Sequence, residues 1–232
     1  MIDLLVSIAV LMLLIAIMLP ALARATETAH RVVCSSNVRQ IGIGLLMYAD
    51  TNQDELVPTT FNSPDKGRLE QMLLLRLGDG GRDGPPLDPS VEGWDGLGIL
   101  FYDEYLSDGK VFFCPSHTGA HPFSAYACCF GGPQTRVVGN YQYRGAGKNG
   151  QRYLSKIEPR RTALIADGMR TQADYNHKVG GNVMRADLSV TWFRDYSGKL
   201  FDQLPAAESQ AASGPVAAAW DLIDGQLGDQ SN

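Results

Sequence analysis

The sequence predicts an α+β fold, in which a long N-terminal α-helix packs on a small antiparallel β-sheet head with loop-rich insertions. The first observation is an uncharged apolar run over residues 4–19. The second is a stripe of apolar residues at helical spacing after it, and the third is a group of short strand-like segments over 137–193. We therefore expect a spine helix over 1–50, a globular head over 51–204 and an Ala/Gly-rich tail over 205–232.

The apolar run has the length of a membrane-spanning helix. With the residues that follow Pro20 it reaches about twenty residues, or about 30 Å, which matches the hydrocarbon core of a bilayer. No basic region precedes it, and Pro20 stands where a secretory signal would be cleaved. We expect Pro20 to kink or locally melt the helix, because proline lacks a backbone N–H. Asp3 begins the run, and a carboxylate there needs a cationic partner.

After Pro20 the helix becomes amphipathic. Apolar residues at steps of four, three, four and three predict one stripe that packs on the head, formed by Cys34, Val38, Ile41, Leu45 and Tyr48. Ile43, Leu46 and Met47 lie off this stripe. They are candidates for contacts with other subunits, or for cover by loops of the same chain.

The helix is expected to end near Asp50. Asp50, Asn52 and Asp54 alternate as at the start of a calcium loop. Glu55 and Phe61 occupy the positions where an EF-hand has Gly and Glu, so a helix-terminating turn is the stronger prediction. Calcium binding at this turn stays a weak alternative.

The head contains four predicted strand segments, over 137–143, 162–166, 182–185 and 189–193, and the last two form a hairpin. Val183, Val190 and Trp192 are expected to face the spine helix. A loop rich in Gly, Pro and Asp covers 78–93. In the tail, residues 217–223 are expected to dock through Trp220, and the rest to be loose.

The opening sequence MIDLLV resembles the Leu-Ile-Glu-Leu-Leu-Val near the start of mature type IV pilins and pseudopilins, with Asp3 in place of Glu. The spacing from Asp3 to Pro20 is also similar. The resemblance implies two further mature residues and a basic leader before Met1. It implies that Asp3 pairs with the N-terminal amine of a neighbouring subunit and sets the axial register, and that the helix loses regularity at Pro20. The filament core would then contain Leu4, Leu5, Ile8, Leu11, Leu14, Ile15 and Leu19.

Later segments are similar to one group of prepilin-like proteins. Residues 34–58 match the stretch after its membrane helix, and 111–117 resemble its Cys-Pro-Ser segment. His177 and Asp187, with nine residues between them, resemble its C-terminal His-x9-Asp-Gly motif, although Leu188 replaces the glycine. The resemblance extends over 1–58, 96–117 and 137–193.

The cysteines and histidines allow several kinds of site. Cys114, His117, His121, Cys128 and Cys129 are close enough in sequence for zinc, but their spacing matches no standard zinc finger. An extracytoplasmic head permits disulfides, so we expect one from Cys114 to Cys128 or Cys129. Cys34 is either a buried thiol or a further disulfide partner, and the sequence leaves the connectivity open.

His177 and Asp187 have the chemistry of an acid–base pair. No nucleophile motif, phosphate loop or metal-ligand helix accompanies them in the sequence. We therefore expect a structural hydrogen bond that holds the hairpin, and no enzyme.

The function predicted is a structural subunit that polymerises with copies of itself into an extracellular type IV pilus-like helical filament. The alternatives are a pseudopilin of a type II secretion system and, from another class, a monomeric membrane-anchored enzyme or binding protein. The net charge of −5 and the lack of a basic stripe argue against nucleic acid as a partner.

No cofactor is expected, calcium aside. The resemblance implies a prepilin peptidase, an inner-membrane platform protein and an assembly ATPase as partners. It also implies N-methylation, and residence in a bacterial inner membrane before assembly at the cell surface.

Overall fold

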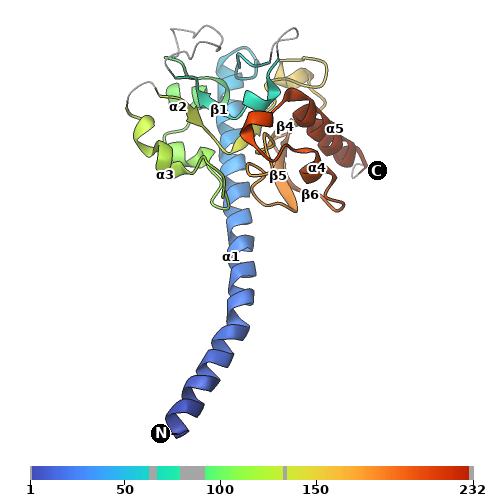
Figure 1. The fold of residues 1–232 in the computed structure, drawn as a ribbon. Helices are drawn as coiled ribbons and strands as arrows, with labels where there is room; N and C mark the ends of the chain where they lie inside the picture. The colour runs from blue at the N-terminus through green and yellow to red at the C-terminus, as the bar shows by residue number, and fades with distance from the viewer. Residues whose placement is uncertain (1, 63–66, 79–91, 133–134, 230–232) are drawn as a thin grey trace.

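The computed structural model describes residues 2–62, 67–78, 92–132 and 135–229. It confirms the α+β class: a long helix carries a head at its C-terminal end (Figure 1). The loop expected over 78–93 lies mostly outside the described residues. The helices and strands are α1 (Ile2–Thr51), β1 (Leu74–Arg76), α2 (Ile99–Tyr102), α3 (Phe123–Tyr126), β2 (Val137–Val138), β3 (Tyr141–Tyr143), β4 (Ala163–Asp167), β5 (Gly180–Arg185), β6 (Val190–Arg194), α4 (Lys199–Gln203) and α5 (Ser213–Asp229).

Helix α1 is continuous over 50 residues and includes Pro20. Local melting at Pro20, which we expected, is therefore not seen in this single chain. A proline removes one helical hydrogen bond, whereas the surrounding Leu, Ile, Met and Ala residues favour the helix and keep it intact. Figure 1 shows the helix curving in its N-terminal half. A bend with the helix preserved is the result expected when one bond of a long helix is lost.

The C-terminal half of α1 docks on the head through the predicted stripe. Cys34, Val38, Ile41 and Leu45 are fully buried there, and Tyr48 is half-buried. Gly42 lies where α1 crosses β5, and any Cβ at this position would overlap the Met184 sulfur. The crossing therefore depends on a glycine that the sequence pattern did not single out.

The apolar residues off the stripe are exposed. Ile43, Leu46 and Met47 retain 45–53% of their accessible surface. The sequence allowed these side chains either to be covered by loops of the same chain or to contact other subunits. In the described structure no loop covers them. These side chains are available to contact other molecules.

Ile41 and Ile43 provide a matched test of this division of the helix surface. Ile41→Val is expected to reduce the free energy of unfolding by about 0.5–1.5 kcal/mol, because it removes a buried methyl group. Ile43→Val, on the same helix but half-exposed, should change it by less than about 0.5 kcal/mol. Denaturant unfolding of the full chain in detergent measures both values. Equal effects at the two positions would contradict the packing described here.

The larger sheet is antiparallel, with the strand order β3-β4-β5-β6, and β1 and β2 form a separate two-stranded sheet. The strand expected over 137–143 is thus two strands. They separate at Gly139 and Asn140 and join different sheets. Helix α1 packs against one face of the larger sheet and α5 against the other.

Val183 faces α5, not α1, which corrects our expectation for the hairpin. In the β5–β6 register Val183 pairs with Thr191, whereas Met184 pairs with Val190. Paired residues of antiparallel strands share a face and neighbours alternate, so Val183 and Val190 lie on opposite faces. Met184 is the β5 residue that packs toward α1.

The C-terminal segment docks through Trp220 as expected, but the packed helix extends beyond 217–223 into residues that we expected to be loose. In α5, Val216, Trp220, Ile223 and Leu227 are buried against the sheet at helical spacing. Asp224, also buried, accepts a hydrogen bond from the Ala163 N–H at 2.8 Å. Alanine favours helix, and the high Ala and Gly content of this segment hid the full extent of the apolar stripe.

Candidate functional site

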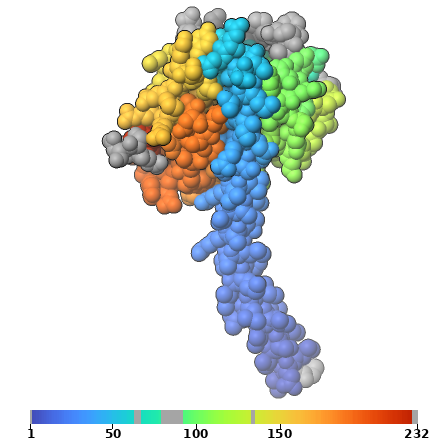
Figure 2. All heavy atoms as spheres, turned by 180° about the vertical axis from the view of Figure 1, so that it is seen from behind, coloured from blue at the N-terminus to red at the C-terminus, as the bar shows by residue number. Residues whose placement is uncertain are grey.

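The first candidate site is the exposed N-terminal half of α1. It projects away from the head as a bare rod, as Figures 1 and 2 show, and its exposed side chains are apolar. Its most apolar 18-residue window has a mean hydropathy of 2.9 and none of it is buried. Within the described residues, α1 is the helix long and apolar enough to cross a membrane, as an anchor or as a signal. All the predicted core residues are 40–68% exposed, namely Leu4, Leu5, Ile8, Leu11, Leu14, Ile15 and Leu19.

Asp3 lies in the first turn of α1, at the far end of this rod. A carboxylate in the first turn interacts favourably with the helix dipole. The pairing of Asp3 with a neighbouring subunit can occur only in an assembled filament. The role of Asp3 in setting the axial register therefore stays a prediction.

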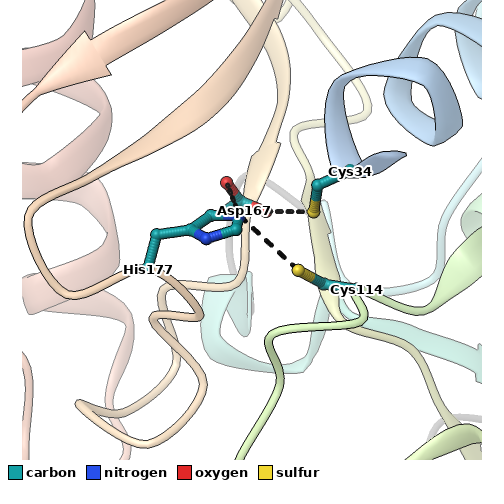
Figure 3. Close-up of side chains that lie close together, drawn as sticks. All are labelled: Cys34, Cys114, Asp167 and His177. Carbon is teal, nitrogen blue, oxygen red and sulfur yellow. Dashed lines mark hydrogen bonds and ion pairs between the residues drawn. The ribbon is translucent and has the colours of Figure 1, made fainter. Parts of the chain in front are cut away.

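The second candidate site is a buried cluster of Cys34, Cys114, Asp167 and His177 (Figure 3). One donor atom from each residue lies within 4.8 Å of all the others. Cys114 Sγ is 3.6 Å from His177 Nε2, and Cys34 Sγ is 3.4 Å from an Asp167 carboxylate oxygen. The second Asp167 oxygen is 3.8 Å from His177 Nε2. Two sulfurs, an imidazole nitrogen and a carboxylate thus converge on one point.

Four separate segments bring these residues together. Cys34 belongs to α1, and Asp167 ends the buried strand β4. Cys114 follows the 3-10 helix Gly109–Phe112, and its N–H donates to Asn140 Oδ1 at 3.1 Å. His177 lies in the connection between β4 and β5. The cluster therefore forms where the spine helix meets the head.

A layer of hydrogen bonds orients the four side chains. His177 Nδ1 is 2.7 Å from a Glu27 carboxylate oxygen, and Glu27 also accepts from Ser116 Oγ at 2.7 Å. Asp167 accepts from the Asn182 N–H at 2.6 Å. The Tyr141 hydroxyl is 3.1 Å from Cys34 Sγ. The side chains of Cys34, Asp167 and His177 thus each have a hydrogen-bond partner outside the cluster, and Cys114 is held through its backbone N–H.

Burial and mutual proximity shift the ionisation of the cluster. Burial would lower the pKa of His177, but its hydrogen bond to Cys114 and the Asp167 charge raise that pKa to about 9. Burial would raise the pKa of Cys114, but its hydrogen bonds with Cys34 and His177 lower it below that of a free thiol. Burial raises the pKa of Asp167 despite the His177 charge. The contact between Cys114 and His177 therefore favours the charged form of each side chain.

The cysteine pairing expected from the sequence is not present in the structure. All four cysteines are free. Cys114 points to Cys34 and His177 in the core, whereas Cys128 is exposed and its sulfur lies 3.7 Å from that of Cys129. The short sequence distance from Cys114 to Cys128 suggested a local disulfide, but the fold directs Cys114 toward the spine helix.

His177 and Asp187 have different partners from those expected. Asp187 accepts from the Ser189 N–H at 3.0 Å and holds the turn between β5 and β6. His177 bonds to Glu27 instead, as described above. The two motif residues therefore serve separate sites, one in the turn and one in the core.

The residues suggested for calcium are engaged in ending α1. Asn52 Nδ2 donates to the Tyr48 carbonyl at 2.9 Å. The Asp54 carboxylate accepts from the Ser155 N–H at 3.0 Å. Asp50 is exposed on the last turn of α1. These contacts match the helix-terminating turn that was the stronger expectation.

Asp167 and Glu27 were not identified as site residues from the sequence. The available signal for Asp167 was a carboxylate that ends a wholly apolar strand, a position where an unpaired charge is costly. For Glu27 it was the seven-residue spacing to Cys34, two helical turns, which places both side chains on one face.

Comparisons with known proteins add no relatives: no family model matches the chain, and no curated protein or solved structure shows significant similarity to it.

Proposed function

We propose that this chain is the structural subunit of an extracellular type IV pilus-like helical filament, in which the exposed half of α1 packs against the same segment of neighbouring copies. The observation that supports the proposal is the bare apolar rod attached to a well-packed head. Soluble monomers rarely expose contiguous apolar patches beyond a few hundred Å². The rod needs lipid or another apolar surface around it.

The rod also suits a transfer from lipid to protein. Lipid tails and leucine side chains are similarly apolar. When a helix moves from a bilayer into a helix bundle, its apolar surface therefore stays shielded from water. In the assembled filament the rod would lie in the core and the head outside. Ile43, Leu46 and Met47, exposed on the side of α1 that faces away from the head, would add contacts between neighbouring subunits.

The partners follow from the same proposal. A prepilin peptidase would process the N-terminus, and an inner-membrane platform protein with a cytoplasmic ATPase would drive assembly. The chain would reside in the inner membrane before assembly and at the cell surface afterwards. All of these rest on the resemblance of residues 1–20 to type IV pilins.

The proposal is tested by negative-stain microscopy of material sheared from the cell surface, with mass spectrometry of the fibre protein. We expect long fibres in which this chain is the main component. Loss of secretion on deletion, without surface fibres, would favour the pseudopilin alternative. A chain found only as a dispersed monomer in the membrane would overturn the proposal.

Asp3→Ala gives a further prediction. We expect the variant to fold and enter the membrane but to yield fewer fibres, because the carboxylate that would pair with a neighbouring N-terminal amine is gone. Fibre yield relative to total chain, measured by immunoblot of sheared and cell fractions, provides the readout. Asp50→Ala, on the same helix but beside the head, is the control and should assemble normally. Normal fibre yield from Asp3→Ala would argue against the register role.

A further inference from the structure

We propose that Cys34, Cys114, Asp167 and His177 bind a structural zinc ion that joins the spine helix to the head. The proposal is independent of filament formation. It rests on the geometry of the four donor atoms, on the residues around them and on their chemistry.

The distances between donor atoms agree with a tetrahedral zinc site. With Zn–S of about 2.3 Å and Zn–N or Zn–O of about 2.0–2.2 Å, two donors of a tetrahedron lie about 3.3–3.8 Å apart. Cys34 Sγ lies 3.4 Å from one Asp167 oxygen, His177 Nε2 lies 3.8 Å from the other, and Cys114 Sγ lies 3.6 Å from His177 Nε2. Every pair lies within 4.8 Å, so a small inward movement of the side chains closes the set. Four protein donors leave no open position, which is typical of structural and not of catalytic zinc.

The surrounding hydrogen bonds are those that metal ligands require. The contact of His177 Nδ1 with Glu27 fixes the tautomer in which Nε2 presents its lone pair to the cluster. Asn182 and Asn176 donate to the Asp167 carboxylate at 2.6 and 3.3 Å. Tyr141 lies within hydrogen-bond distance of the Cys34 sulfur. The carboxylate–histidine pair and the hydrogen-bonded acidic side chain that such a metal site needs are thus already in place.

The charges also call for a cation. All four residues are at least 95% buried, with exposed fractions of 0–5%. As ligands, two thiolates and one carboxylate carry three negative charges, which are costly to bury without a counter-ion. Zn²⁺ offsets two of them, and sulfur donors select it over calcium or magnesium. A groove lined by Asn37, Phe113 and His117 reaches Cys114, the cluster residue nearest the surface there.

A Cys34–Cys114 disulfide is the rival use of these cysteines. It would join α1 to the head through two residues, and would leave His177 and Asp167 beside an uncharged bridge that needs neither. Zinc uses all four residues, including the buried carboxylate and the oriented imidazole. The positions of His177 and Asp167 therefore favour zinc over the disulfide.

The consequence is a cross-link between distant parts of the chain. The four ligands come from α1, the segment after Gly109–Phe112, β4 and the β4–β5 connection. One ion would thus fix the helix to three segments of the head at once. Such a joint resists separation of the helix and head when force is applied to either.

The test uses the full chain, extracted from membranes in detergent without chelator or reductant. Elemental analysis is expected to give one zinc per chain, and alkylation under denaturing conditions with a chelator to find all four cysteines as free thiols. Replacement of zinc by Co²⁺ should give tetrahedral visible bands with strong thiolate-to-cobalt charge transfer. Absence of zinc, or a Cys34–Cys114 disulfide in the isolated chain, would overturn the proposal.

Variants locate the ion. Cys114→Ser should lose zinc, whereas Cys128→Ser, which changes an exposed cysteine outside the cluster, should keep it. Glu27→Gln retains every ligand and should weaken zinc affinity by about 10–100-fold, because it alters the His177 partner. If Cys114→Ser fails to fold, the cobalt spectrum of the unaltered chain and the Glu27→Gln affinity still decide. Full zinc binding by Cys114→Ser would place the metal elsewhere and contradict the assignment.

Discussion

Replacing Leu11 by arginine is expected to abolish fibre formation while leaving the head folded. Leu11 lies near the middle of the apolar run, far from the head, and is 59% exposed in the single chain. In a bilayer the arginine costs about 2.5–3.5 kcal/mol near the centre and can extend toward the interface. In a bundle of identical helices every copy would carry the charge, and like charges without partners would be buried together. The expected readout is chain in the membrane fraction and no fibres by negative stain.

Leu11→Met is the matched control, since it keeps the position apolar at similar volume and should assemble normally. The membrane fraction of each variant is measured in parallel, so that failed insertion is not mistaken for failed assembly. Normal fibres from membrane-inserted Leu11→Arg would show that the rod is not the assembly surface.

Trp220→Ala is expected to reduce the free energy of unfolding of the head by about 3–5 kcal/mol. Trp220 is 2% exposed and packs between α5 and the sheet. The Arg144 guanidinium also lies over its ring, 5.4 Å from the centroid. Removing the indole leaves a cavity that backbone elements on both sides cannot close. Denaturant unfolding of the full chain in detergent, followed by the remaining tryptophan fluorescence, measures the loss.

Tyr196→Ala serves as the control for this variant, because Tyr196 is an aromatic residue with 80% of its surface exposed. Its effect should stay within about 0.5 kcal/mol. If Trp220→Ala were equally mild, α5 would not be a part of the core.

The elements with strong periodicity were predictable from the sequence. The apolar run and the stripe through Val38 and Leu45 define α1 by composition and spacing alone. The hairpin of β5 and β6 was also evident, within a few residues at its ends. What failed there was the face assignment of Val183, because an antiparallel register cannot be read from either strand alone.

The buried cluster was less accessible to sequence reasoning. Cys34, Cys114 and His177 were each noted, but 62 residues separate Cys114 from His177, and the tertiary packing that brings their segments together is non-local. Local spacing favoured Cys128 as a partner of Cys114 instead. The docking of Trp220 and Ile223 was expected, but the full length of α5 was not, since its small residues made the flanking Val216 and Leu227 inconspicuous.

The most direct test of the account is a helical reconstruction by electron cryomicroscopy of fibres sheared from the cell surface. The account predicts that residues 4–19 of each subunit lie along the fibre axis and contact the same segment of neighbouring subunits, with the heads outside. Fibres held together by the heads alone, with this segment outside the core, would contradict it.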